Sequence, residues 1–407
     1  MRLSKICRQL LGVDPLIADD VEFFGHDLIF HVRPRWRKPR CGGCGRKCPG
    51  YDVRRIRYWR HMAMGRAVVW LAYAPRRVTC PVCGVRTEKV PWARHRSRFT
   101  LGLEELVAYL AQQMDKTAIT RLLGLSWRAV GSIICRIVDE RLDEARFEGL
   151  RVIGADEFSY RKRHRYLTVV VNHECRQVIW VSRGRGADAL QGLFERLGPS
   201  GRKMIETVTI DMAGGYIKAV EQSLPNAEIV FDRFHVQQLA GNAVDEVRRE
   251  EVRNLDDTEA ARFIKGSRYA LLKSPWNLTR NQKQQLSEIQ HNNARLYRAR
   301  LLNDALADAL EYRQPKRARQ ALDEWLAWAS RSQLKPFIKL ARTIRKYKER
   351  ILAYIKERYT NAIVEGMNNR IRMIARRAYG FHSAEALQSM IFLCLGGIKL
   401  NPPLPTH

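Results

Sequence analysis

The chain has 407 residues, of which 45% are hydrophobic, enough for two or three domains with cores of ordinary size. Seventy-two lysines and arginines oppose 42 aspartates and glutamates, a formal net charge of +30. So large an imbalance causes self-repulsion, which excludes a neutral metabolic enzyme as the default interpretation and favours a polyanionic partner. The longest apolar runs, such as Ala67–Ala74, are much shorter than the ~20 residues that span a bilayer. We therefore expect a cytoplasmic protein with no membrane partner.

Four cysteines form two C-x-x-C pairs that are separated by 35 residues. Each pair stands beside glycine or proline, as required by the tight turn that brings two thiolates to one tetrahedral ion. This spacing predicts a structural Zn²⁺ site. The four cysteines are Cys41, Cys44, Cys80 and Cys83. Disulfides are the alternative, and they fit a reducing cytosol poorly; Cys48 and His61 are further candidates if one of the four is not a ligand.

Residues 1–98 carry half of the excess positive charge, with 22 basic and 7 acidic residues. Basic side chains neutralise phosphates, and aromatic residues interleaved with them can stack on bases. These aromatic residues are Trp36, Tyr51, Tyr58 and Trp59. The alternative is that the rings form the small core of a metal-stapled fold. Because Val21–Val32 and Val68–Tyr73 have the apolar pattern of strands, we expect residues 1–98 to form a zinc ribbon that binds DNA.

From Leu101 the apolar residues recur at helical spacing. Two helices are expected at Leu101–Gln113 and Lys116–Leu123, and Ser126 is the predicted N-cap of a third that runs to Val138. A short helix, a turn with a glycine and a longer helix are typical of a helix-turn-helix, so residues 99–148 are predicted to contact DNA. A plain helical hairpin is the alternative. The arginines expected on or near its exposed faces are Arg121, Arg128 and Arg136.

Residues 149–236 have the pattern of three successive strands followed by alternating helices and strands. The strands are expected at Arg151–Phe158, Tyr166–Val171, Gln177–Val181, Thr207–Asp211 and Glu228–Asp232. That order is typical of a ribonuclease H-like α/β fold. From Val236 to Tyr359 the pattern is almost wholly helical. Its last part, Lys335–Arg358, has nine basic and two acidic residues; nucleic-acid contact is the favoured hypothesis and a solvated helix face the alternative.

Two aspartates follow apolar runs with the character of buried strands. Asp156 closes Val152–Ala155, and Asp211 closes Val208–Ile210. A carboxylate in such a place is costly to desolvate unless a cation or a donor meets it. Two of them at one rim of a sheet suit Mg²⁺, which prefers a few carboxylates and keeps some of its waters. The alternative is that each aspartate only caps the turn or helix that follows.

Four runs in this order resemble the core motifs of DDE transposases, and most closely those of the ISL3 family of bacterial insertion-sequence transposases. They are Ile153–Phe158, Thr209–Met212, Phe231–Val236 and Asn361–Asn369. The resemblance covers essentially the whole chain, and it implies that Asp156, Asp211 and Glu365 are the catalytic triad. It also implies that Asp232 and His235 support this site rather than bind the metal; a structural role for His235 is the alternative.

Glu365 lies on a predicted helix together with amides and arginines at steps of three and four residues. One acid on such a face suits a metal ligand flanked by phosphate contacts; ordinary charge pairing is the alternative. The residues predicted to contact DNA there are Asn368, Asn369, Arg372 and Arg376. Because Asp211 and Glu365 are so far apart, residues 237–358 are interpreted as a helical insertion, as in hAT-like and Mutator-like transposases. The catalytic core is then 149–236 with 359–400.

The sequence thus predicts a multidomain DNA transposase. Two Mg²⁺ ions at the triad would serve cleavage at terminal inverted repeats and strand transfer into target DNA, and a structural Zn²⁺ would organise the N-terminal domain. Pairing two element ends favours a homodimer or higher oligomer on DNA. A non-catalytic regulator with zinc and helix-turn-helix domains, a structure-selective junction nuclease and an inactive domesticated transposase are the alternatives.

Overall fold

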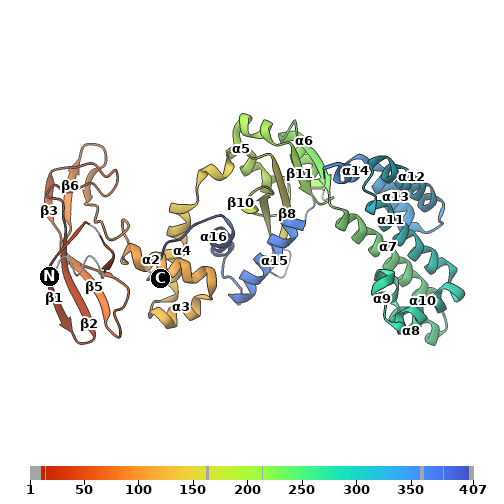
Figure 1. Ribbon diagram of the computed structural model, residues 1–407, viewed down its shortest axis with the longest axis horizontal. Coiled ribbons are helices and arrows are strands. Elements are labelled where there is room, and N and C mark those ends of the chain that lie inside the picture. Colours follow the sequence, from red (N-terminus) through yellow and green to blue (C-terminus); the bar gives the residue numbers. More distant parts are fainter. Residues whose placement is uncertain are drawn as a thin grey trace. The chain divides into compact units, whose positions relative to one another are not determined.

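The structure is a computed structural model of the chain, and it describes residues 11–13, 15–161, 165–212, 214–357, 362–378 and 380–402. By their contacts these residues form two compact units. The first contains the described residues up to Asp143 together with those from Ile371 onward, and the second contains Glu144–Arg370. Figure 1 labels most of the elements of both units.

The larger of two sheets in the first unit has the strand order β1-β2-β5-β4. Its strands are β1 (Leu16–Phe24), β2 (Asp27–Pro34), β4 (Arg57–Arg60) and β5 (Val68–Tyr73). Trp92 is fully buried in its core and makes edge-to-face contacts with Trp59 and Tyr73. Packing therefore accounts for Trp59, whereas Tyr51 and Tyr58 are exposed.

A second sheet of three antiparallel strands carries the cysteine pairs. It contains β3 (Gly50–Val53), β6 (Arg76–Cys80) and β7 (Gly84–Thr87), in the order β3-β6-β7. Cys80 ends β6, and Cys83 lies in the turn that leads to β7. The region is rich in β-structure, as expected, but it consists of two sheets rather than one ribbon.

Three helices follow at the positions expected from their caps. They are α2 (Leu101–Gln113), α3 (Lys116–Leu123) and α4 (Trp127–Arg141). The Ser126 side chain accepts a hydrogen bond from the Ala129 N–H and begins α4, and Gly124 ends α3 at a left-handed φ of 59°. The direction of the chain changes by 110° between α3 and α4, as in a helix-turn-helix.

The C-terminal helix α16 (Ala384–Leu395) packs on α2 and α4 and belongs to the first unit. Gln112 Nε2 donates to the Leu393 carbonyl at 2.7 Å and ties it to α2. Residues 359–400 were expected in the α/β core, so this placement differs from the prediction. The physical reason is that α16 is apolar on most of its surface, and an apolar helix needs partners on more than one side.

The second unit contains a five-stranded sheet with the order β10-β9-β8-β11-β12. Its strands are β8 (Val152–Arg161), β9 (Arg165–Asn172), β10 (Gln177–Arg183), β11 (Thr207–Ile210) and β12 (Glu228–Phe231). The first three are antiparallel neighbours, while β11 is parallel to both β8 and β12. All five expected strands are present in the expected order.

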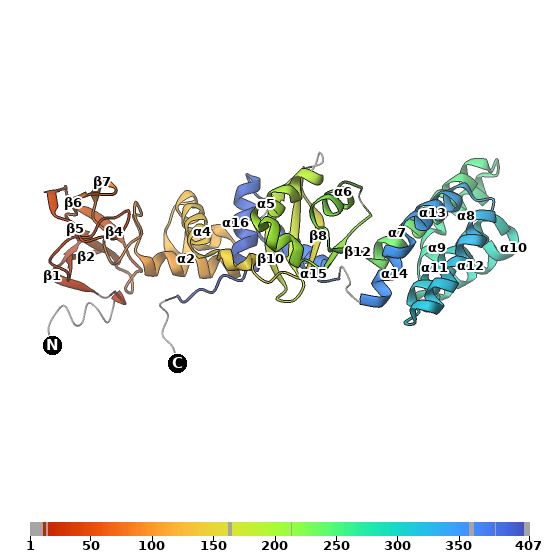
Figure 2. The ribbon, with the colours of Figure 1, turned by 90° about the horizontal axis from the view of Figure 1, so that it is seen from above.

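Helices cover both faces of this sheet, as the two views show (Figures 1 and 2). On one face, α5 (Ala187–Met204) and α6 (Gly214–Ser223) bury the apolar side chains of Ile153, Ala155 and Ile210. The other face is contacted by α15 (Ala362–Arg377), whose Val364 lies over Gly154 of β8. A short 3-10 turn, Glu144–Phe147, precedes the sheet.

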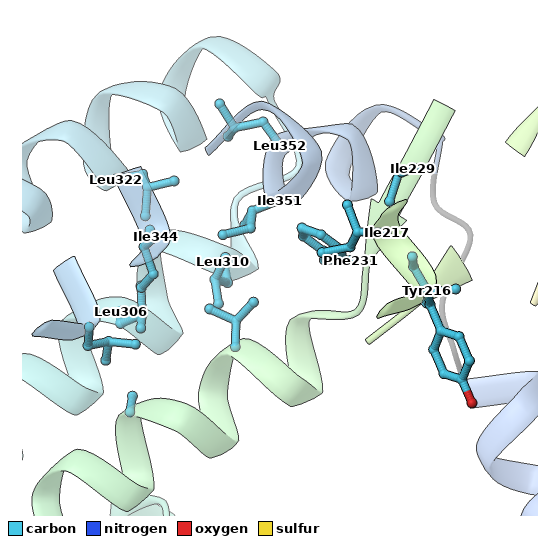
Figure 3. Packing of buried hydrophobic residues seen from close by; sticks show 14 of the residues in the cluster. Tyr216, Ile217, Ile229, Phe231, Leu306, Leu310, Leu322, Ile344, Ile351 and Leu352 are labelled. Atoms are coloured by element: carbon cyan, nitrogen blue, oxygen red, sulfur yellow. The ribbon is translucent and has the colours of Figure 1, made fainter. Parts of the chain in front are cut away.

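The helical stretch that was expected after the last strand is present. Its helices are α7 (Arg233–Asn254), α8 (Thr258–Gly266), α9 (Arg268–Leu272), α10 (Arg280–Asn292), α11 (Ala294–Glu311), α12 (Pro315–Arg331), α13 (Lys335–Lys346) and α14 (Lys348–Glu357), with a 3-10 turn at Pro275–Asn277. One apolar cluster continues from the sheet into these helices (Figure 3). Phe231 of β12 meets Tyr347 edge to face at 5.3 Å, so the edge strand supports the helices.

Among the described residues, no single helix has the length and the apolar composition of a membrane span. Only α3 and α4 taken together, across their 110° bend, meet that criterion.

Candidate active site and metal centre

Asp156 and Asp211 lie on neighbouring parallel strands. Gly154 of β8 is the register partner of Thr209 of β11. Because side chains two residues apart on a strand point to the same face, Asp156 continues the face of Gly154, and Asp211, one residue past the end of β11, follows Thr209. Strand β8 runs on to Arg161, so Asp156 ends only the apolar part of its strand.

The Asp156 carboxylate has donors on both oxygens. Its Oδ1 accepts from the Glu157 N–H and its Oδ2 from Asn368 Nδ2, each at 2.7 Å. Burial raises the pKa of Asp156, and the negative charge of Asp211 adds to the rise. The Glu157 N–H, His235 and the Asn368 amide act in the opposite direction. Two like charges in a partly buried place favour a cation between them.

Glu157 is a third carboxylate in this neighbourhood. Its pKa is raised by burial and then by Asp211 and Asp156, against the opposing charge of Arg185. Because it follows Asp156 in the strand, its side chain points to the opposite face of the sheet, the face of Thr168 and Tyr216. The sequence placed Glu157 beside Asp156, but only the strand geometry separates their environments.

Gly154 allows α15 to lie directly on the sheet. A Cβ atom at this position would stand 2.4 Å from Val364 Cγ2 and 2.6 Å from both His173 Nε2 and Thr209 Oγ1. These distances are too short for any real contact, so a larger residue would push the helix away. His173 is itself buried, which lowers its pKa to about 4, and it hydrogen-bonds Thr209 Oγ1 at 2.9 Å. No pattern in the sequence singles out Gly154, Val364 or His173 individually.

Helix α15 presents two different faces near Asp156. Asn368 is 1% exposed and hydrogen-bonds Asp156, and its own buried Oδ1 accepts no hydrogen bond from any described residue. This placement differs from the expected contact with DNA. Glu365, Asn369, Arg372 and Arg376 are among the exposed positions of the helix. They recur at steps of four, three and four and share one face, as the sequence predicted.

The three predicted catalytic acids are not gathered at ligand distance. Among the described residues, only the four cysteines form a group of three or more His, Cys, Asp or Glu residues whose ligand atoms all lie within 4.8 Å of one another. Asp156 and Asp211 influence each other electrostatically, while Glu365 lies one turn before Asn368, the residue that contacts Asp156.

Asp232 and His235 lie at the beginning of α7. Asp232 is buried and is the N-cap of the helix, accepting from the Phe234 N–H at 3.2 Å. His235 lies close enough to Asp156 to lower the pKa of that carboxyl. The structure therefore associates His235 with the acidic site and gives Asp232 a capping contact.

The four cysteine sulfurs of the two C-x-x-C pairs all lie within 4.8 Å of one another. The Cys83 and then the Val82 backbone N–H groups lower the pKa of Cys80 to about 6, which favours the thiolate. The neighbouring Cys44 thiol and burial raise the pKa of Cys83, so loss of the last protons requires a cation. Gly43 lets the backbone approach, because its Cβ would lie only 3.2 Å from Cys83 Sγ. This donor set suits a tetrahedral metal ion.

The two further candidate ligands differ in position. Cys48 is buried against this cysteine cluster, and its Sγ donates weakly to the Arg46 carbonyl at 3.5 Å. His61 instead hydrogen-bonds Thr100 Oγ1, the cap of α2, at 2.8 Å. Burial lowers the pKa of His61 to about 4. His61 is thus a neutral packing residue of the larger sheet.

The three arginines of the helix-turn-helix that were predicted to contact DNA differ in exposure and in their contacts. Arg121 and Arg128 are exposed, and Arg128 lies in the first turn of α4. Arg136 points toward Glu104, whose side chain is 0% exposed, and forms an ion pair with it. Arg94 binds the same carboxylate at 2.8 Å. Arg136 therefore has a structural contact that competes with its predicted role.

Comparison with known proteins gives two matching family models and several similar transposases. A family model described as transposase, of the DDE type in family ISL3, matches residues 153–391, and the helix-turn-helix domain of transposase family ISL3 matches residues 88–138. The transposase for insertion sequence element IS1557 of Mycobacterium tuberculosis is 36% identical, over 100% of this chain and 98% of its own. The transposase for IS1001 of Bordetella parapertussis is 33% identical, over 89% and 90%.

Proposed function

Because this chain belongs to the ISL3 family of transposases, and is therefore a DNA-binding enzyme that cleaves and transfers DNA strands, we propose that Asp156, Asp211 and Glu365 are its catalytic acids. The observation that carries the proposal is the position of Asp156 on β8 and of Asp211 just past the end of the adjacent parallel strand β11, with α15 held over the sheet by Val364 and Asn368. Glu365 lies on the exposed side of the same turn of that helix.

We further propose that these acids hold Mg²⁺ as a pair of ions. The residues fit such ions, because the Asp156 carboxylate, whose pKa is raised by burial and by the charge of Asp211, and the orphaned oxygen of Asn368 are hard oxygen ligands. When bound, the metal would lower the pKa of the attacking water or DNA 3′-hydroxyl and stabilise the leaving oxygen. Glu365 would complete the site by a side-chain rotation or a small shift of α15.

The chain's own residues have separate tasks in this proposal. Asn368 orients the Asp156 carboxylate through Oδ2, while the Glu157 N–H holds Oδ1. His235 places a group that can carry positive charge beside the same carboxylate. Gly154 sets the closeness of α15 to the sheet. Asn369, Arg372 and Arg376 line the exposed face of α15 next to Glu365, where they would contact the DNA phosphates.

We propose that the α/β core is ribonuclease H-like and that residues 237–358 are an insertion in it. Support comes from the strand order β10-β9-β8-β11-β12, with three antiparallel strands followed by two parallel ones. The helices α7–α14 come between β12 and α15, the helix that carries the third acid. Their apolar core is continuous with that of the sheet, so the insertion would stabilise the edge strand.

We propose that the four-cysteine site holds Zn²⁺ and that the region it organises recognises terminal inverted repeats together with the helix-turn-helix. The exposed Arg121 and Arg128 are the side chains on which base or phosphate contact is proposed. Synapsis of two ends would require a homodimer or higher oligomer on DNA, working on the nucleoid in the bacterial cytoplasm.

The test is cleavage of a labelled duplex carrying the element's end, with Mg²⁺, by the wild-type protein and by Asp156→Asn. We expect specific nicking by the wild type and a loss on the order of 1,000-fold or more in the variant, with end binding retained. Equal cleavage by both proteins would refute the role of Asp156. Specific binding with no cleavage by the wild type would favour a regulator, and cleavage of branched DNA of any sequence would favour a junction nuclease.

A further inference from the structure

A large open groove lies in the first unit, beside the cysteine cluster. Its volume is about 1120 Å³. Its lining comes from the cysteine-bearing sheet, from β4 and the segment that follows residue 88, and from the end of α4. We call it the cationic groove, and the basic side chains of its lining without a carboxylate partner among the described residues are Arg54, Arg57, Arg86, Lys89, His95 and Arg96. Arg77, Arg94 and Arg136 also line it, and each forms an ion pair.

Two of the three acidic side chains in the described lining are committed to ion pairs. Glu88 is 0% exposed in its side chain and binds Arg76 at 2.9 Å and Tyr73. Glu140 forms an ion pair with Arg94. Asp139 is the remaining acid of the lining. Among the described residues, no carboxylate is paired with Arg54, Lys89 or Arg96, so the groove keeps its positive charge.

The cations of the groove repel one another. Burial lowers the pKa of Arg57, and the charges of Arg98 and Arg54 lower it further. His95 has its pKa lowered by burial and then by Arg96, Arg86 and Arg57. Side chains that destabilise each other in the free protein become favourable when anions lie between them.

Two of these side chains are held in place by neighbouring groups. The Arg57 guanidinium lies over the Trp59 ring at 5.0 Å and donates to the Ser97 carbonyl. The His95 ring lies against the first cysteine turn, since a Cβ on Gly42 would stand 2.9 Å from its Nδ1. An exposed cation that is solvated on all sides has no such anchors, so a simple solvated face does not account for Arg57.

The lining also indicates which form of nucleic acid fits. Unpaired bases need exposed aromatic rings on which to stack. Among the described residues that line the groove, Trp59 is the only Trp, Tyr or Phe, and it is only 2% exposed. The groove thus offers charge without a stacking surface. Its side wall, α4, is the second helix of the helix-turn-helix, so DNA held there would continue along the same unit.

We infer that the cationic groove binds the sugar–phosphate backbone of duplex DNA beside the segment contacted by α4. The inference rests on the proposed recognition of element ends by this unit, and it adds a contact that is independent of base sequence. Phosphate contacts set the position of a protein on DNA, while base contacts specify the sequence. The groove would therefore supply affinity and register, and α4 would supply specificity.

The experiment measures the affinity of the full chain for duplex DNA as a function of salt, in an Asp156→Asn background that prevents cleavage. The test variant is Arg54→Gln/Arg57→Gln/Arg96→Gln. The control removes the same charge from exposed arginines of the same unit outside the groove, as Arg33→Gln/Arg35→Gln/Arg66→Gln. Zinc content and Tm check the folding of each variant, and a triple Arg→Lys variant of the groove keeps the charge.

We expect the test variant to lose about 10-fold or more in affinity and the slope of log K against log salt to fall by about 2 to 3, equally for the end duplex and a scrambled duplex. The control and the lysine variant should remain close to the parent. The inference is overturned if the test and control variants lose the same affinity, if the slope is unchanged, or if only single-stranded DNA responds. Failure of wild-type cleavage would count against the catalytic proposal and leave this outcome unaffected.

Discussion

The two candidate metal sites of this chain are assembled in opposite ways. Each C-x-x-C turn brings two thiols together by itself, and four sulfurs end within 4.8 Å of one another. The acidic site takes its residues from β8, the end of β11 and α15, and its three carboxylates are not grouped at that distance. A site made of local turns is arranged by the backbone, whereas a site made across a sheet depends on packing and, as proposed, on its cation.

Removing two thiols should have the largest effect. Cys41→Ser/Cys80→Ser leaves two ligands, and structural zinc contributes on the order of 10 kcal/mol to folding of small metal domains. We expect the variant to lose about one zinc ion per chain and to lose duplex binding. Circular dichroism should show that the N-terminal sheets are unfolded. Cys175→Ser, at an exposed cysteine outside the cluster, is the control. Retained zinc and binding in the double variant would contradict the four-cysteine site.

The acidic site should instead be sensitive to packing. Gly154→Ala would place a methyl group against Val364, His173 and Thr209, at a cost of about 1–3 kcal/mol. Because α15 must shift to make room, cleavage should fall more than duplex binding. The control is Gly366→Ala on the same helix, where a Cβ meets nothing within 4 Å and helix propensity improves by up to about 1 kcal/mol. Equal thermal unfolding of the two variants would show that α15 does not lie on Gly154.

Adjacent amides on α15 offer a finer comparison. Asn368→Ala removes a hydrogen bond to the Asp156 carboxylate, which corresponds to about 1.5–3 kcal/mol for a charged acceptor. We expect cleavage to fall by about 10- to 100-fold. We also expect Mn²⁺ binding, measured by calorimetry, to weaken. Asn369→Ala alters an exposed side chain and should reduce DNA affinity without changing metal binding. The reverse pattern would restore the original assignment of Asn368 to DNA.

The smallest effect concerns the metal-free protein. The raised pKa of Asp156 means that the folded chain holds this proton more tightly than the unfolded chain, so ionisation at higher pH destabilises the fold. Asp156→Asn in EDTA should therefore increase Tm by a few degrees at pH 8, and by less at pH 5. Added Mg²⁺ should stabilise the wild type and not the variant. A lower Tm for the variant at pH 8 would mean that the ionised carboxylate is well solvated or already paired.

Much of the local structure was predictable from local signals. The caps at Ser126 and Gly124 predicted the helix-turn-helix boundaries, because a cap is a contact within three or four residues. The succession of strands along the chain in the α/β core followed from runs of apolar residues. The position of α16 could not be predicted in this way, because the apolar composition of a helix indicates that it is buried but not which elements it packs against. Arg136 and Asn368 were placed on exposed faces from periodicity alone, and their partners Glu104 and Asp156 lie on other elements.

The amino-acid order by itself determined the composition of each site: four thiols in two turns, aspartates after apolar runs, and a surplus of cations in the first quarter of the chain. The tertiary structure decided which of those groups meet. It turned Asn368 inward onto Asp156, required glycine at position 154 beneath Val364, and arranged arginines around one groove. The physical reason is range: turn and cap preferences act over a few residues, whereas desolvation, repulsion and steric fit exist only after distant segments pack together.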